Sequence, residues 1–347
     1  MSTTTTPAHP TTPQTDDAAE RVRRIVQHPL FVVISALIAL LLVFTLINGP
    51  TFVGATNVRN MALAGSIVLI LAIGVTLAII TAGFDLSVGS VLVLSGVLSV
   101  VAMREMGGSG WPTALVGLVV ALVSGAVLGA INGALIAYAE LNPIIVTLGS
   151  FGSALGIAQV VTGGPDLNNV PPQMADFGLA RVIGVPTVVI IAALIALVVG
   201  SVLRSTAFGR HTYAIGSNAE AAVRAGVNVR GHLTVIYLIS GLLAGLAGWL
   251  SLAVYGTTNI NGHSLDALVA ATAALLGGAS LFGGVGSVAG TVFGNAIPVV
   301  LASGLVIAGL QSFWQQAVTG VVLVGAIYID RLRRLRMGRR PRGTAPR

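Results

Sequence analysis

Few side chains in this sequence could carry chemistry, and Asp85 stands out among them. It lies in the motif Gly83-Phe84-Asp85-Leu86-Ser87-Val88-Gly89-Ser90, and no other formally charged residue occurs from position 60 to position 103. A carboxylate inside a membrane is costly unless it is paired, which makes Asp85 a candidate ligand for a substrate or an ion. The other interpretation is a helix cap, because Asp85 precedes an apolar run and its oxygens can accept from the first N–H groups of a helix.

A second group of polar residues lies in the segment 207–230. Ser217 is followed three residues later by Glu220, which is typical of a capping box, and Gly226 suits the left-handed residue that closes a helix. Glu220 and Arg224 form an i,i+4 pair in the more stabilising order. The pattern predicts a helix of about two turns, which is too short to be stable alone. It either packs on the ends of this protein's own spans or docks a cytoplasmic partner.

A third cluster lies near the carboxyl terminus, where Trp314 is followed by Gln315 and Gln316. Aromatic rings stack on sugars and amides bond to their hydroxyl groups, so this cluster could line a polar path. Anchoring of the tryptophan at a membrane surface is the alternative. The sequence shows no Ser/His/Asp pattern, no paired carboxylates and no nucleotide fingerprint. It also contains no lysine, so a Walker-type ATPase is excluded.

The elements that position these residues must be membrane helices. Of the 347 residues 55% are apolar and only 8% are charged, and there is no cysteine. A soluble chain of this size needs a more polar surface, so a soluble enzyme, a disulfide scaffold and a disordered chain are excluded. Apolar runs of about 20 residues predict an all-α polytopic membrane protein with about ten spans, some of them short or broken. We place the spans at 30–48, 61–81, 87–103, 112–138, 143–162, 186–203, 232–255, 267–282, 286–309 and 313–330.

The arginines predict the orientation. They gather before the first span, in the loop 204–231 and after the last span. Cytoplasmic loops retain basic residues, and ten spans place these three segments on one side, so we expect both termini in the cytoplasm. Residues 1–28 are predicted to be a disordered tail, 29–331 the membrane domain with its loop 204–231, and 332–347 a basic tail that meets anionic lipid.

An internal repeat is also predicted. Residues 82–91 recur loosely as residues 277–288, with two extra residues in the second copy. We place the copies five spans apart, an odd number, so we expect them to face opposite sides of the membrane. Such an inverted repeat with broken helices is typical of transporters.

Taken together, these motifs resemble the permeases of bacterial ABC importers for monosaccharides, the ribose, xylose and galactoside group. The resemblance covers roughly residues 57–334 and includes the loop 209–227. The sequence departs from the family's usual pattern at Phe84, Ser264 and Ala279, which weakens any naming of the sugar. The matching motif residues, which would be structural or line the translocation path, are Gly83, Asp85, Ser87, Gly89, Ser90, Asn142, Pro143, Asp266, Gly277 and Gly278.

The resemblance implies a transport subunit rather than an enzyme, in the bacterial cytoplasmic membrane. Such a permease forms a dimer, receives sugar from an extracytoplasmic binding protein and docks a cytoplasmic ATPase. The partner ATPase uses ATP and Mg, whereas this chain binds no cofactor, no metal and no nucleic acid. The expected ATPase-docking residues are Arg210, Ser217, Glu220, Arg224 and Gly226, and the possible path residues are Trp314, Gln315 and Gln316.

Two other classes remain open on the sequence. An ion-coupled secondary transporter would also have an inverted repeat, but it needs titratable groups in the membrane and Asp85 is nearly alone. An ABC permease for a non-sugar solute, such as an amino acid, would differ only in its substrate. A channel is less favoured, because no charged ring or carbonyl filter motif is present.

Overall fold

The computed structural model describes residues 29–107, 109–168, 170–263 and 265–311, with positions 314, 317, 318, 320–322, 324, 325 and 328. Eight of the described helices are long and apolar enough to cross a membrane. The only strands in this part of the chain form one short antiparallel pair. The prediction of an all-α polytopic membrane protein is therefore confirmed. Both predicted tails and half of the predicted span 313–330 fall outside the described residues.

The long helices lie close to the predicted spans. They are α2 (Pro29–Asn48), α4 (Ala55–Ile80), α5 (Val88–Glu105), α6 (Gly110–Ala137), α7 (Pro143–Thr162), α9 (Thr187–Ser205), α12 (Val229–Tyr255) and α14 (Val288–Ile307). The bounds of α7 agree with the predicted span. The Asn142 side chain accepts from the backbone N–H of Ile144 at 2.9 Å, and Pro143 occupies the first turn.

Shorter elements connect the long helices. They are α3 (Pro50–Val53), α8 (Pro172–Leu179), β1 (Arg181–Val182), β2 (Val185–Pro186), α10 (Ala207–Ser217), α11 (Ala219–Arg224) and α13 (Asp266–Leu276). α13 is shorter than the predicted span 267–282, because Gly277 and Gly278 end it and Gly278 adopts a positive φ of 93°. α10 was not predicted as a helix, since the sequence indicated only a loop there.

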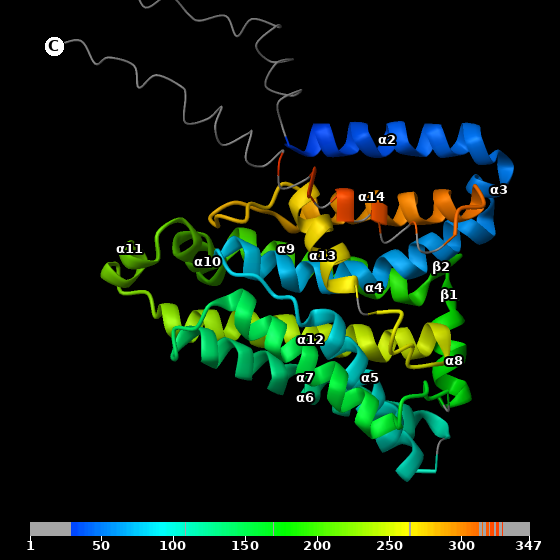
Figure 1. Ribbon diagram of the computed structural model, residues 1–347, viewed down its shortest axis with the longest axis horizontal. Coiled ribbons are helices and arrows are strands. Elements are labelled where there is room, and N and C mark those ends of the chain that lie inside the picture. Colours follow the sequence, from blue (N-terminus) through cyan, green and yellow to red (C-terminus); the bar gives the residue numbers. More distant parts are fainter. Residues whose placement is uncertain are drawn as a thin grey trace, which may run out of the picture.

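The helices form a bundle in layers (Figure 1). α2 lies at one edge beside α14, and α6 and α7 lie at the opposite edge. Between them are α4, α9 and α13, followed by α12. α10 and α11 project at one end of the bundle, whereas α8 and the two strands lie at the other end. α4 is central, and its residues from Ile70 to Ile80 are buried.

The closest helix pair, α6 with α12, is held by glycines. Gly125 and Gly129 of α6 face Gly241 and Gly245 of α12, and a Cβ built at Gly241 would collide with the carbonyl oxygen of Gly125. Small residues four apart let two membrane helices approach until their backbones touch. This contact fixes α6 against α12 and thereby sets the position of the polar residues that both helices carry.

Two breaks interrupt the bundle, one at 81–87 between α4 and α5 and the other at 277–287 between α13 and α14. They lie against each other, because the Gly284 N–H donates to the Ile80 carbonyl oxygen at 2.8 Å. The prediction that the two repeat copies face opposite sides is therefore wrong. Six helices of the bundle separate the breaks (α5, α6, α7, α9, α12 and α13), and this even number returns the chain to the same end.

Candidate functional site

Asp85 lies in the first break and is only 1% exposed. Its Oδ1 accepts from the Ser87 backbone N–H at 3.0 Å and from the Ser87 hydroxyl at 2.6 Å. Its Oδ2 accepts from the Ser240 hydroxyl of α12 at 2.7 Å. Ser87 directly precedes α5 and makes no capping hydrogen bond itself, whereas Asp85 accepts from the Ser87 backbone N–H, as the capping interpretation predicted. The carboxylate also binds the break to α12.

The hydrogen bonds continue from Ser87 across two more helices. Asn132 of α6 is 1% exposed and donates from Nδ2 to the Ser87 hydroxyl oxygen at 3.0 Å. The Ser150 hydroxyl of α7 donates in turn to Oδ1 of Asn132. Each donor in this series points toward Asp85, and hydrogen bonds arranged in this way polarise one another. We call these five residues the polar chain, namely Ser150, Asn132, Ser87, Asp85 and Ser240.

The backbone of the break is held beside the polar chain. The Phe84 carbonyl oxygen accepts from the Tyr237 hydroxyl of α12 and from the Thr147 hydroxyl of α7, both at 3.4 Å. A Cβ built at Gly83 would lie 2.5 Å from the Tyr237 hydroxyl oxygen. Gly83 is thus required for the close approach of Tyr237, which is itself fully buried.

At the α10–α11 end, the predicted short helix is present but begins one residue later than expected. Asn218 is the N-cap of α11, and its Oδ1 accepts from the Ala221 N–H at 2.9 Å. Ser217 is the last residue of α10, so the predicted capping box of Ser217 and Glu220 is wrong. The physical reason is the backbone: Asn218 is extended with φ −163°, as an N-cap residue must be, whereas Ser217 is still helical.

The other predicted features of α11 are present. Gly226 adopts a positive φ of 83° after the helix, and an Arg224 guanidinium nitrogen lies 3.6 Å from a Glu220 carboxylate oxygen. Arg210 and Val223 are also exposed, whereas Ala222 faces inward and is buried. The two short helices therefore present a charged and partly apolar surface away from the bundle, which we call the α10–α11 surface (Arg210, Glu220, Val223 and Arg224).

The inner side of α10 is wedged between the two breaks. Gly216 packs so tightly that an added Cβ would collide with the Ile80 carbonyl oxygen and would lie 2.5 Å from the Gly284 nitrogen. A Cβ on Gly284 would in turn lie 2.5 Å from the Ser217 hydroxyl oxygen. The end of α10 thus contacts both glycine-rich breaks at once.

A second polar cluster lies between α12 and α13. The Ser251 hydroxyl is 2.9 Å from Nε2 of His263, whose Nδ1 is 2.7 Å from Oδ2 of Asp266. This order of groups resembles that of a serine hydrolase, although the sequence gave no sign of it. Ser251 is 2% exposed inside a packed helix, so no substrate can reach it in this arrangement. The cluster instead anchors the loop 256–265, whose residue His263 also packs on Gly89.

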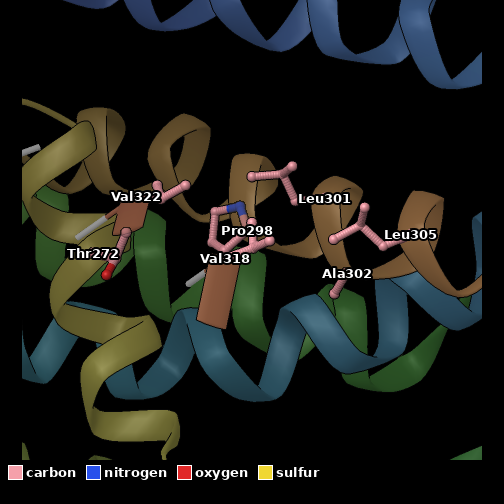
Figure 2. A pocket seen from close by; sticks show the side chains of 7 residues that line it. All are labelled: Thr272, Pro298, Leu301, Ala302, Leu305, Val318 and Val322. Carbon is pink, nitrogen blue, oxygen red and sulfur yellow. The ribbon is translucent and has the colours of Figure 1, made fainter. Parts of the chain in front are cut away.

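The pocket in Figure 2 lies between α13, α14 and residues 318 and 322. Its lining is apolar except for one hydroxyl, and it comprises Thr272, Pro298, Leu301, Ala302, Leu305, Val318 and Val322. The Thr272 hydroxyl already donates to the Leu268 carbonyl oxygen at 2.7 Å. This pocket therefore lacks the polar groups that a sugar needs. Trp314 is exposed, and its predicted companions Gln315 and Gln316 lie outside the described residues.

The remaining predicted residues have structural roles in the described part of the chain. Ser90 donates to the Ser87 carbonyl oxygen at 2.9 Å, and Asp266 opens α13. An added Cβ at Gly277 would collide with Gly290 of α14. Sequence reasoning missed Asn132, Ser150 and Ser240. The available signal was the presence of polar side chains within otherwise apolar spans, which is uncommon and points to buried partners.

Comparison with known proteins identifies the protein family that this chain matches. Residues 57–327 match the family described as branched-chain amino acid transport system / permease component. The ribose import permease protein of Escherichia coli K12 is 36% identical over 306 residues, covering 85% of this chain and 92% of that protein. The fructose import permease protein of Rhizobium meliloti is 36% identical over 310 residues, covering 87% and 84%.

A third relative widens the range of sugars. The xylose transport system permease protein of Escherichia coli K12 is 31% identical over 362 aligned residues, covering 87% of this chain and 91% of that protein. No solved structure matches the chain. The family match over residues 57–327 includes both breaks and the α10–α11 surface.

Proposed function

The chain belongs to the family of permease components of branched-chain amino acid transport systems, and from this membership we propose that it is the membrane-spanning permease of an ATP-driven monosaccharide importer. The observation that carries the proposal is the similarity to ribose, fructose and xylose permeases over at least 85% of this chain. The relatives span both a pentose and a hexose class, so the substrate class is a pentose or hexose rather than one named sugar. The chain supplies the path, and no chemical step is assigned to it.

The family description favours one second candidate, because it names branched-chain amino acids. The two substrates differ in charge: a monosaccharide is neutral, whereas an amino acid is zwitterionic and needs charged partners in the path. In the described bundle Asp85 has both oxygens occupied by this chain's own donors. Asp85 is also only 1% exposed, so an ammonium group cannot reach it in this arrangement, which supports the sugar.

The free energy of ATP hydrolysis would be coupled to transport at the α10–α11 surface. A partner ATPase docks there and uses ATP and Mg, and its nucleotide-driven closure moves α10 and α11. Two features support the assignment: α11 is capped at both ends although it is too short to be stable alone, and its charged residues face outward. The basic residues of this end support its assignment to the cytoplasm, with the α8 end outside, where a binding protein would deliver the sugar.

We assign the path to an assembly of two copies. The pocket between α13, α14 and residues 318 and 322 has an almost wholly apolar lining, so it does not suit a sugar. α7 has an outward face on which Gly149, Gly152 and Gly156 have nothing within 4 Å of an added Cβ. The outward residues of α6 are large and apolar, as lipid contact requires, and α7 exposes Ile145 and Val160 beside its glycines. A small-residue face of this kind suits a second helix.

A transport assay tests the proposal. The chain is expressed with its ATPase and binding protein in cells that lack ribose, fructose and xylose importers, and uptake of each labelled sugar and of leucine is measured. We expect sugar uptake that requires ATP and survives a protonophore while ATP is held constant. Uptake of leucine alone would favour the second candidate. Uptake by the purified chain alone in liposomes, driven by an ion gradient, would identify a secondary transporter instead.

A further inference from the structure

We propose that the break 81–87 transmits movement of the α10–α11 surface to α7. In this proposal Asn132 and Ser150 are positioning residues for transport. The proposal rests on the proposed function, since it concerns how docking of the ATPase moves the path. It assigns a role to the polar chain, whose residues Asp85, Ser87 and Asn132 are buried. Three contacts connect the α10–α11 surface to α7.

The first contact joins α10 to the break. Gly216 fits against the Ile80 carbonyl oxygen with no room for even a methyl group, and the Gly283 and Gly284 backbones lie on its other side. A packed contact without voids transmits displacement rather than absorbing it. A movement of α10 therefore displaces Ile80, which is the last residue of α4 and directly precedes the break.

The second contact lies within the break. Ala82 has a positive φ of 61° and the Gly83 N–H donates back to the Ala78 carbonyl oxygen at 2.9 Å, so the helix ends sharply. From Phe84 onward the segment makes no helical hydrogen bonds until α5 begins at Val88. Its position is set instead by side chains of other helices, through the Phe84 carbonyl oxygen and the Asp85 carboxylate. A segment held in this way can move as a unit between two arrangements.

The third contact carries the displacement to α7. The Ser87 hydroxyl receives a hydrogen bond from Asn132, and Asn132 receives one from Ser150 on α7. The Thr147 hydroxyl, one turn earlier on α7, donates to the Pro143 carbonyl oxygen at 2.8 Å and also lies 3.4 Å from the Phe84 carbonyl oxygen of the break. In the described bundle α7 packs mainly on α5 and α6, and its other face is open. These bonds therefore connect the break to α7. The small-residue face of α7 is free to form the path.

The test compares two serines in matched settings. Ser150→Ala removes the bond from α7 to Asn132, whereas Ser124→Ala removes a 3.0 Å hydroxyl bond from α6 to Ser95 of α5, outside the link. Both serines are half-buried helix residues that bond to a side chain of another helix. Each variant is purified with the ATPase and binding protein and placed in liposomes, and import and ATP hydrolysis are measured together with a sugar that the wild-type complex imports.

We expect Ser150→Ala to retain ATPase binding and hydrolysis but to import roughly five- to tenfold less sugar per ATP, as loss of one net hydrogen bond allows. Asn132→Leu should do the same, and the double variant should be no worse than Asn132→Leu alone. Ser124→Ala should keep the wild-type ratio. An unchanged ratio in Ser150→Ala, or an equal change in Ser124→Ala, would overturn the link. Absence of ATP-driven import by the wild-type complex would instead reject the proposed function.

Discussion

At the scale of single residues, Asp85 illustrates how a membrane protein keeps a carboxylate in its interior. Three donors surround its oxygens at 2.6 to 3.0 Å, and within the described residues no cation forms an ion pair with it. Hydrogen bonds to a charged acceptor are roughly twice as strong as neutral ones. The fold therefore stabilises the carboxylate by placing these three donors around it. The donors in turn need the carboxylate as their hydrogen-bond acceptor.

This dependence gives a stability prediction. Asp85→Leu keeps the volume but leaves the Ser87 and Ser240 hydroxyls without their acceptor, which should lower the free energy of unfolding by about 1–3 kcal/mol per unsatisfied group. Asp85→Asn keeps one acceptor oxygen and should cost less. Thermal unfolding of the purified protein in detergent measures both. The exposed Asp176→Asn is the control and should unfold like wild type. Equal unfolding temperatures for Asp85→Leu and wild type would contradict the role of Asp85.

At the scale of elements, two kinds of contact hold the bundle. α6 and α12 meet through backbone surfaces that glycines expose, whereas α7 is attached on one side only and keeps an open glycine face. Glycine occupies both the α6–α12 contact and the open face of α7, but its surroundings differ. Adding one methyl group should therefore have opposite effects on the two helix surfaces.

Gly241→Ala should destabilise the protein, because the new Cβ would collide with the Gly125 carbonyl oxygen and separate α6 from α12. Gly149→Ala meets nothing within 4 Å in this chain, and alanine favours the helix by about 1 kcal/mol, so the monomer should not be weakened. Thermal unfolding in detergent compares the two. If Gly149→Ala leaves stability intact but reduces crosslinking between copies, the assignment of α7 to the dimer gains support, and unchanged crosslinking would argue against it.

The short helix α11 gives a separate prediction. Asn218→Ala removes the N-cap bond to Ala221 and should cost about 0.5–2 kcal/mol of helix stability, whereas Asn218→Ser keeps a capping oxygen. Because the spans do not depend on this loop, insertion into the membrane should be unchanged. We expect copurification of the ATPase to fall for Asn218→Ala and to recover for Asn218→Ser. Wild-type copurification in the alanine variant would mean that α11 is only a connector.

At the scale of the whole molecule, the two ends of the bundle differ in charge. The α10–α11 end carries Arg204, Arg210, Arg224 and Arg230 with Glu140 and Glu220, a net charge of +2. The α8 end carries three arginines and three acidic residues, a net charge of 0, namely Arg59, Arg104, Arg181, Glu105, Asp166 and Asp176. Membrane proteins retain arginines on the cytoplasmic side. The charge difference therefore predicts which end meets the ATPase and which meets the delivered sugar.

Single cysteines can test this orientation, because the natural sequence contains none. A cysteine at Asn218, exposed at the start of α11, should react with a membrane-impermeant maleimide only after the cells are opened. One at Asn168, exposed at the α8 end, should react in intact cells. The cysteine-free parent should not be labelled. Labelling of the Asn218 variant in intact cells would reverse the proposed orientation and move the ATPase surface to the other end.

The sequence by itself determined the class, the helices and several local features. The lengths of apolar runs locate eight of the ten predicted spans as long helices and a ninth as the shorter α13. Asn142, Pro143 and Gly226 begin or end helices where their backbone preferences require it. These features depend on neighbours within a few residues, so periodicity and composition are sufficient to find them.

The tertiary structure alone decided which residues meet. Asp85 bonds to Ser240, 155 positions away, and the two breaks face the same end of the bundle rather than opposite ends. The N-cap of α11 is Asn218 rather than the predicted Ser217, because the preceding residues continue α10 as far as Ser217. Uniformly apolar spans carry little information about which neighbour each helix will choose. That choice depends on where glycines let backbones touch and on which buried polar groups can satisfy one another.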